Sequence, residues 1–312
     1  MSVTVVGSVA FDGVKTPFGE RERMLGGAAT HFALAASFFE RVNVVGCVGE
    51  DFTDEHMAEL ETRGTGTEDV ERVAGGKTFF WRGSYGWDLN SRDTLETQLN
   101  VFESFEPKLS DEARGCDVLF LANIQPGLQQ QVRSLCEDAR LVAIDSMDLW
   151  IETAREELVE VVSGVDCVVL NDAELRQLTE APNVVTAART VLGWGPRLVV
   201  AKQGEYGAVA ITADSFFSLP AYPLERVVDP TGAGDTFAGG LIGYLGMHLD
   251  EGLGDEVLRR AMAYGTALAS FNVGEFGVDG VRDLDPERVH ERVAELASFT
   301  RFDHAPVGLV SA

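Results

Sequence analysis

The chain has 312 residues, 45% of them aliphatic or aromatic, which is enough to bury the core of one large α/β domain. Acidic residues outnumber basic ones by 50 to 25, and the net charge of −25 argues against nucleic acid or an anionic membrane as a partner. No apolar run approaches the roughly 20 residues that a membrane-spanning helix needs. The four scattered cysteines are typical of reduced thiols in a cytoplasmic protein.

Lysine is scarce among the basic residues. The lysines are Lys15, Lys77, Lys108 and Lys202. One interpretation is a GC-rich genome that favours arginine codons. The other is adaptation to high salt, where salt screens the self-repulsion of an acidic surface. The dependence of the melting temperature on KCl concentration separates the two.

The first third of the chain alternates between strand and helix patterns. Residues 2–10 are apolar without a basic leader, which predicts a first buried strand rather than a signal peptide. A helix of small residues follows the Gly26-Gly27 pair, and residues 42–48 form a second run of buried strand type. Strand–helix–strand order with nearly continuous Val and Ile runs predicts a parallel sheet covered on both faces.

Residues 70–106 interrupt this rhythm. The segments 78–85 and 99–105 are rich in aromatic residues, which predicts antiparallel strands appended to the main sheet. We expect a single domain spanning 1–312, with a lid formed by about 12–20 and 70–106. An ordinary edge hairpin is the alternative.

The alternation of predicted strands and helices then resumes. Strands are predicted at 118–122, 141–144, 165–170 and 198–201, and a β-hairpin at 208–211 and 216–219. Four helices are predicted at 151–162, 184–192, 254–271 and 286–297. Two others are predicted to end at about 139 and at 178, and one to begin at 235.

The segment 229–235, Asp-Pro-Thr-Gly-Ala-Gly-Asp, combines a tight loop with the start of a helix. The first N–H groups of a helix are unpaired and lie at the positive end of its dipole. Gly232 and Gly234 would let a ligand approach these groups closely. We therefore expect this loop to bind a phosphate and Asp235 to accept a proton beside it.

Polar residues also follow several predicted strands. They are Asp12, Asn123, Asp145, Asn171, Glu174, Lys202 and Asp229. In open parallel sheets, ligands bind at the carboxyl ends of the strands, so these residues are expected to surround one site.

Two common glycine motifs are excluded. A dinucleotide-binding fingerprint that starts at Gly232 would need glycine where Phe237 stands. A Walker A loop that ends at Lys77-Thr78 would need glycine where Glu71 stands. By motif the chain is neither a Rossmann dehydrogenase nor a P-loop NTPase.

Four motifs resemble those of the ribokinase/PfkB family of sugar and nucleoside kinases, in the family's order and at its usual spacing. They are Gly26-Gly27, Asn171-Asp-Ala-Glu174, Lys202-Gln-Gly-Glu-Tyr-Gly207, and Asp229-Pro-Thr-Gly-Ala-Gly-Asp235, the most specific of the four. The resemblance implies a ribokinase-like three-layer α/β fold, with a mostly parallel central sheet and a small antiparallel β lid. It also implies ATP-dependent phosphorylation of an alcohol.

The resemblance assigns roles to residues on both sides of the transferred phosphoryl group. Phosphoryl transfer needs positioning and charge neutralisation, which the backbone of Gly232, Ala233 and Gly234 would supply as an anion hole, with Asp235 as general base. The implied Mg²⁺ residues, acting through water, are Asn171 and Glu174. The implied nucleotide-side residues are Lys202, Gly204, Gly207 and Thr231. The implied acceptor-side residues are Asp12, Gly26, Gly27, His31 and Asn123.

The acceptor stays open at this point. A primary hydroxyl of a small sugar or polyol is the first hypothesis, and a nucleoside such as adenosine or cytidine is the alternative. A third hypothesis is a catalytically silent sugar- or nucleotide-binding protein. His31 stands where many family sugar kinases carry asparagine, so no known sugar specificity transfers directly. The resemblance further implies a homodimer through the lid, and leaves open a dependence on a monovalent cation.

Overall fold

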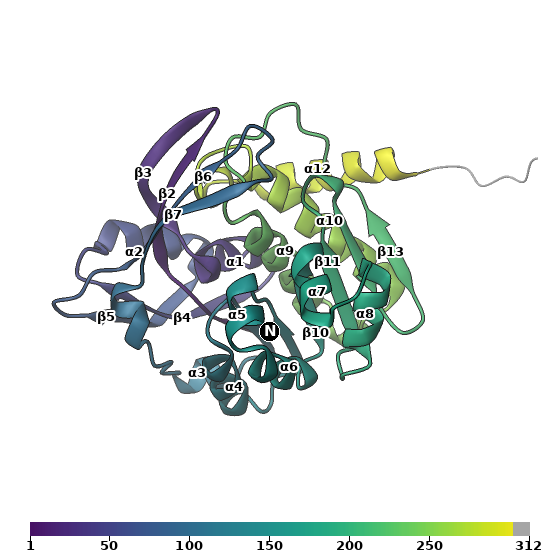
Figure 1. The fold of residues 1–312 in the computed structure, drawn as a ribbon, viewed down its shortest axis with the longest axis horizontal. Helices are drawn as coiled ribbons and strands as arrows, with labels where there is room; N and C mark the ends of the chain where they lie inside the picture. Colours follow the sequence, from purple (N-terminus) through teal and green to yellow (C-terminus); the bar gives the residue numbers. More distant parts are fainter. Residues whose placement is uncertain (302–312) are drawn as a thin grey trace, which may run out of the picture.

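Two β-sheets organise the chain in the computed structural model, which describes residues 1–301 (Figure 1). Within these residues the large sheet has nine strands, in the spatial order β13 (Phe216–Leu219), β12 (Ala208–Ile211), β11 (Leu198–Lys202), β10 (Cys167–Asn171), β9 (Leu141–Ile144), β8 (Val118–Leu121), β1 (Ser2–Val6), β4 (Arg41–Gly49) and β5 (Gly66–Val73). All neighbours from β5 to β11 pair in parallel, and β12 and β13 add antiparallel strands at one edge.

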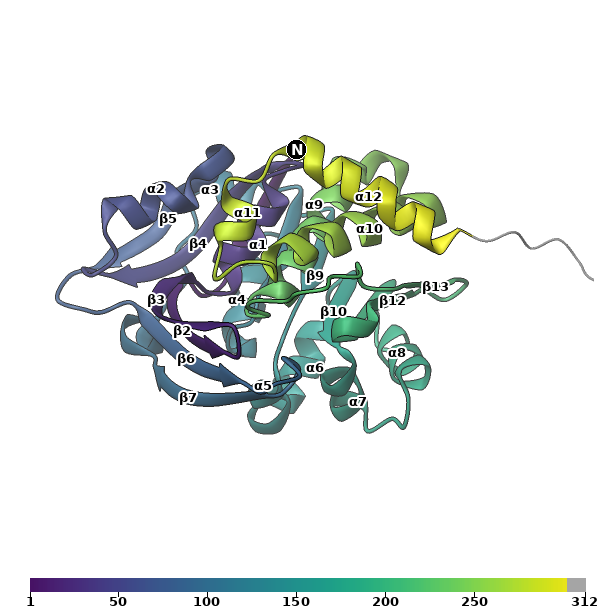
Figure 2. The same ribbon diagram turned by 90° about the horizontal axis from the view of Figure 1, so that it is seen from above.

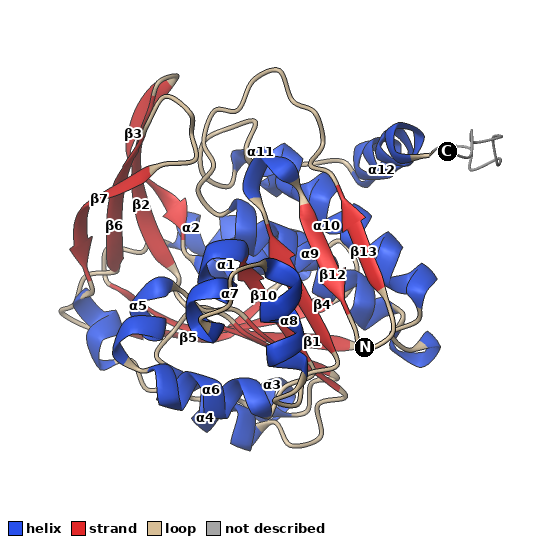
Figure 3. Ribbon diagram, turned by 45° about the vertical axis from the view of Figure 1, so that its right-hand side comes forward, coloured by secondary structure: helices blue, strands red, loops and turns tan. Residues whose placement is uncertain are grey.

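Helices cover both faces of the large sheet because its strands alternate apolar side chains to either side (Figure 3). Val3 and Val5 of β1 join one core, whereas Val6 joins the other. The helices of the first core are α1 (Ala28–Ala36), α2 (Asp54–Leu60), α9 (Ala233–Met247), α10 (Asp255–Asn272), α11 (Asp279–Arg282) and α12 (Pro286–Thr300). Those of the second are α3 (Asp111–Arg114), α4 (Pro126–Leu135), α5 (Asp148–Thr153), α6 (Arg155–Ser163), α7 (Asp172–Thr179) and α8 (Val184–Leu192). The predicted three-layer α/β class is confirmed.

Glycines allow α1 and α9 to pack against each other in the same direction. A Cβ on Gly239 would collide with the carbonyl oxygen of Phe32, and one on Gly243 would lie 3.0 Å from that of Ala36. The second contact lies four residues further along both helices, so α1 and α9 run in the same direction. Their N-terminal ends therefore lie at the same side of the sheet.

The small sheet has the order β3 (Gly19–Gly26), β2 (Ala10–Thr16), β6 (Phe79–Tyr85) and β7 (Arg92–Gln98). Its pairs are antiparallel except at the centre, where β2 and β6 run in parallel. Figure 2 shows the sheet standing beside the large one, with β7 on its outer edge. It therefore spans 10–26 and 79–98, whereas the sequence predicted a lid of about 12–20 and 70–106.

Three predicted elements differ from the structure. The strand predicted at 99–105 is wrong, because 100–104 form a short 3₁₀ helix from which Phe102 stacks on Phe79 and Phe105. The strand that does pair with β6 is β7, whose exposed and mostly polar residues show no apolar alternation. The helix predicted at 151–162 is divided between α5 and α6 by the non-helical backbone of Ala154. Among the described residues, no helix is long and apolar enough to cross a membrane.

Candidate active site

The loop before α9 is shaped by a buried carboxylate. Asp229 accepts hydrogen bonds from the N–H groups of Thr231 at 2.9 Å and Gly277 at 3.1 Å. Gly232 then takes a left-handed conformation, with φ at 71°, and caps α9. Ala233 N–H donates to the Pro230 carbonyl at 3.2 Å, but no hydrogen bond within residues 1–301 uses the N–H groups of Gly232 or Gly234. Two of the three predicted anion-hole donors are thus available to a ligand.

The same loop is supported from α10 and α1. Asn272 donates through Nδ2 to the Thr231 carbonyl at 2.8 Å, and its Oδ1 accepts from Thr236 Oγ1 at 3.1 Å. The Nδ1 of His31 lies 3.1 Å from the same Oδ1, and the His31 ring lies against Gly232, where any Cβ would collide with it. Burial lowers the pKa of His31 to about 4, so the ring is neutral at pH 7. The structure places His31 beneath the loop, with 2% of its surface exposed.

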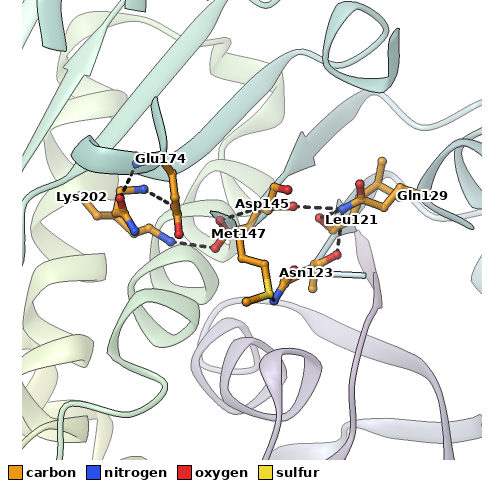
Figure 4. Close-up of polar contacts among 10 residues, drawn as sticks. Leu121, Asn123, Gln129, Asp145, Met147, Glu174 and Lys202 are labelled. Atoms are coloured by element: carbon orange, nitrogen blue, oxygen red, sulfur yellow. Dashed lines mark hydrogen bonds and ion pairs between the residues drawn. The ribbon is translucent and has the colours of Figure 1, made fainter. Parts of the chain in front are cut away.

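A charged cluster lies where β9, β10 and β11 end (Figure 4). Lys202 Nζ donates to Asp145 Oδ2 at 2.7 Å. Burial raises the pKa of Asp235 to about 7, with Asp145 adding to the effect and Lys202 opposing it. Burial likewise raises the pKa of Glu174 to about 7, against the attraction of Lys202. Three carboxylates therefore share one ammonium group, an arrangement that an added cation would stabilise.

Asp145 was expected near the site because of its place at a strand end, but the family resemblance assigned it no role. Its backbone carbonyl accepts from Gln129 Nε2 at 3.0 Å, and its Oδ1 accepts from Ser146 N–H at 2.8 Å. The Gln129 amide also binds the carbonyls of Leu121 and Ala122, so it joins the ends of β8 and β9 (Figure 4). These bonds hold the Asp145 carboxylate in place for Lys202.

The two predicted metal residues bind each other at the start of α7. Asn171 N–H donates to Glu174 Oε2 at 2.9 Å, and Glu174 N–H donates to Asn171 Oδ1 at 2.7 Å, which completes a capping box. Within residues 1–301 no group of three or more His, Cys, Asp or Glu side chains could enclose a metal. The remaining Glu174 oxygen and the excess negative charge suit a Mg²⁺ that keeps most of its waters.

The acceptor-side residues come together only in part. The carboxylate of Asp12 lies beside Gly26, where a Cβ would collide with it, and close to the backbone of Gly27. Burial and the nearby Asp229 raise the pKa of Asp12 to about 7. Asn123, in contrast, is engaged elsewhere, because its Oδ1 accepts from Trp150 Nε1 at 2.9 Å. Its Nδ2 donates to Met147 Sδ at 3.1 Å (Figure 4).

A cavity of about 510 Å³ lies on the other side of the loop. Three of the predicted nucleotide-side residues, Lys202, Gly204 and Gly207, line it, whereas Thr231 does not. Apolar residues complete its walls, among them Leu224, Val227, Phe237, Ala269 and Val273. A few polar groups set among apolar walls suit the binding of a nucleotide.

The small sheet contributes residues that sequence reasoning missed. Tyr85 Oη accepts a hydrogen bond from Thr231 Oγ1 at 3.1 Å, although the two residues are far apart in the sequence. Arg92 pairs with Tyr85 across the β6–β7 ladder, and its charge opposes the rise in the pKa of Asp12 and of Asp235. No local signal marks either residue, because the sequence predicted the wrong partner strand for β6.

Comparisons with known proteins identify the family and the fold of this chain. A family model described as pfkB family carbohydrate kinase matches residues 3–283. A protein of Thermococcus kodakarensis named cytidine kinase is 34% identical over 254 residues, which cover 78% of this chain and 88% of the relative. The solved Methanocaldococcus jannaschii nucleoside kinase has a TM-score of 0.75 at 19% identity, covering 94% of this chain and 98% of that one. Arabidopsis thaliana ribokinase, solved with ribose and ATP, has a TM-score of 0.74 at 20% identity, covering 93% and 98%.

Proposed function

This chain belongs to the pfkB family of carbohydrate kinases and is therefore an ATP-dependent phosphotransferase, and on that premise we propose that its acceptor is a nucleoside. The γ-phosphoryl group of ATP would pass to the nucleoside's primary hydroxyl. The sequence alone favoured a sugar or polyol as the first hypothesis. The relative named cytidine kinase, at 34% identity, supports the nucleoside instead.

One observation of the structure carries the proposal: an aromatic surface beside the buried acceptor-side carboxylate. Asp12 of β2 and Trp81 of β6 are paired in the parallel ladder, so their side chains share a face of the small sheet. The Trp81 ring lies over Gly83, where a Cβ would collide with it. Ribose hydroxyls at Asp12 would thus place a nucleobase within reach of an aromatic ring on which it could stack.

The chemistry follows from the residues around the α9 loop. Asp235 would accept the proton of the attacking hydroxyl, because its carboxylate lies in the first turn of α9, directly after the loop. The free N–H groups of Gly232 and Gly234 would bind the migrating phosphoryl group. Lys202 lies close to this path, since a Cβ on Gly234 would be 3.1 Å from its Nζ. A Mg²⁺ held through water by Asn171 and Glu174 would neutralise phosphate charge.

A small sugar remains the second candidate. Asp12, Gly26 and Gly27 would bind hydroxyl groups of free ribose as readily as those of a nucleoside, and their contacts require no base. A silent binding protein is the third, but a protein that only binds would not require Asp235 beside an open anion loop. Turnover of any acceptor excludes it.

The test is a panel of acceptors with Mg·ATP, in which ADP formation is measured for cytidine, uridine, adenosine, ribose, deoxyribose and fructose. We expect a nucleoside to give the highest kcat/KM. Trp81→Leu should then raise the KM for that nucleoside about 5- to 150-fold, because stacking a base on an aromatic ring contributes about 1–3 kcal/mol.

Trp87→Leu is the matched control, because Trp87 lies on the same hairpin and is 85% exposed. It should leave the KM unchanged. Preference for ribose or another free sugar over every nucleoside would overturn the nucleoside proposal, and so would an equal effect of the two tryptophan substitutions.

A further inference from the structure

The turn that joins β6 to β7 forms part of the donor-side cavity. Asp88, Leu89 and Asn90 line this cavity together with Gly204 and Glu205, which follow β11. Asn90 Nδ2 donates a hydrogen bond to Glu205 Oε1 at 3.0 Å. The small sheet, which presents Asp12 and Trp81 to the acceptor, therefore also closes one side of the cavity in which the nucleotide is expected.

Hydrogen bonds within the β6–β7 turn fix its shape. The Asp88 carboxylate accepts from the N–H groups of Asn90 and Ser91, both at 3.2 Å, and from Ser91 Oγ at 3.1 Å. Gly86 N–H donates to the Ser91 carbonyl at 2.9 Å. Leu89 takes a left-handed backbone conformation, with φ at 57°. These local hydrogen bonds fix the turn that carries Asn90, whose side chain contacts Glu205.

The hairpin contacts the site at two separate points. At the anion loop, Tyr85 accepts the hydrogen bond from Thr231. On the donor side, Asn90 binds Glu205, a residue of the glycine-rich segment 202–207. Tyr85 and Asn90 lie five positions apart, so one short hairpin carries both contacts.

We propose that residues 88–90 are a further part of the donor-nucleotide site and that Asn90 and Glu205 form a clasp over the bound nucleoside triphosphate or diphosphate. The nucleotide leaves when the clasp opens. Both side chains are exposed, so the hydrogen bond contributes little to folding and can open and close during turnover. Binding of the nucleotide and closure of the hairpin over the acceptor are then coupled, and the coupling is reciprocal.

The test is the rate at which a fluorescent ADP analogue dissociates from the full chain, measured by stopped flow after mixing with excess unlabelled ADP. Asn90→Ala should release the analogue roughly 3- to 10-fold faster, the effect of one net hydrogen bond. Glu205→Ala should have the same effect, and the double variant should be no faster than either single one, since both remove the same contact. Glu205→Gln keeps the accepting oxygen and should restore slow release.

Asp93→Ala is the matched control, since Asp93 is exposed on β7 and makes no side-chain hydrogen bond within residues 1–301. Its release rate and the melting temperatures of all variants should equal those of the unsubstituted protein. Unchanged release in Asn90→Ala, or effects of the two alanine substitutions that add in the double variant, would refute the clasp. The inference rests on the proposed donor. If the proposed donor is wrong, the unsubstituted protein will not bind the nucleotide at all. That result differs from unchanged release in Asn90→Ala, and it would also refute the clasp.

Discussion

Lys202 Nζ lies 2.7 Å from Asp145 Oδ2, and the two side chains are only 16% and 5% exposed. They stand at the ends of β11 and β9, on either side of β10, which carries Asn171. Burial alone would lower the pKa of Lys202, but Asp145, Glu174 and Asp235 outweigh it and hold the pKa above its usual value. One ammonium group thus maintains the charge balance of the site.

Removing this ammonium group should destabilise the protein. In Lys202→Met, Asp145 loses its buried partner, and breaking such a pair costs about 3–5 kcal/mol of unfolding free energy. Urea unfolding monitored by circular dichroism measures the loss. Lys108→Met is the control, because the Lys108–Glu71 pair is exposed and should contribute at most about 1 kcal/mol. Equal losses in the two variants would contradict a structural role for the buried pair.

The activity should depend on pH through Asp235. A general base acts only when deprotonated, and burial raises the pKa of this carboxyl to about 7. We therefore expect kcat/KM to rise as the pH rises through about 7 and to level off above 8, because kcat/KM reports groups of the free enzyme.

Asp235→Asn should lower kcat on the order of 10²–10⁴-fold and abolish this rise, while nucleotide binding persists. Activity in Asp235→Asn within a few fold of the unsubstituted protein would show that another group accepts the proton. A rise that persists in the residual activity would assign the titration to Asp12 or Glu174, whose pKa values burial also raises to about 7.

The small sheet is the surface through which we expect two copies to associate. Its outer strand β7 is an unpaired edge within residues 1–301, and it exposes 56% of Leu95. An exposed strand edge with an apolar side chain can pair with another chain. Light scattering at micromolar concentration should show a dimer, and Leu95→Asp should shift it to a monomer. Leu135→Asp, on α4, is the control, and a monomer in the unsubstituted protein would refute the expectation.

The sequence predicted much of the fold because strands buried on both faces and helices with apolar stripes are local patterns. The runs at 42–48, 118–122 and 198–201 became β4, β8 and β11. The polar strand β7 was missed because solvent covers all its side chains, and its pairing with β6 leaves no apolar alternation to detect. The segment 99–105 misled for the opposite reason: Val101 and Phe105 are buried, but they lie in and directly after a 3₁₀ turn rather than in a strand.

By itself the sequence determined the class of chemistry. The segment 229–235 is a loop that opens into a helix with Asp235 in its first turn, and this local order of glycines and carboxylate specifies an anion site beside a base. Only the tertiary structure decided which groups, distant in the sequence, contact that site. The buried pair of Asp145 and Lys202, the His31 ring beneath Gly232 and the contact between Asn90 and Glu205 depend on long-range packing. Such contacts join residues tens to hundreds of positions apart, and no local pattern records them.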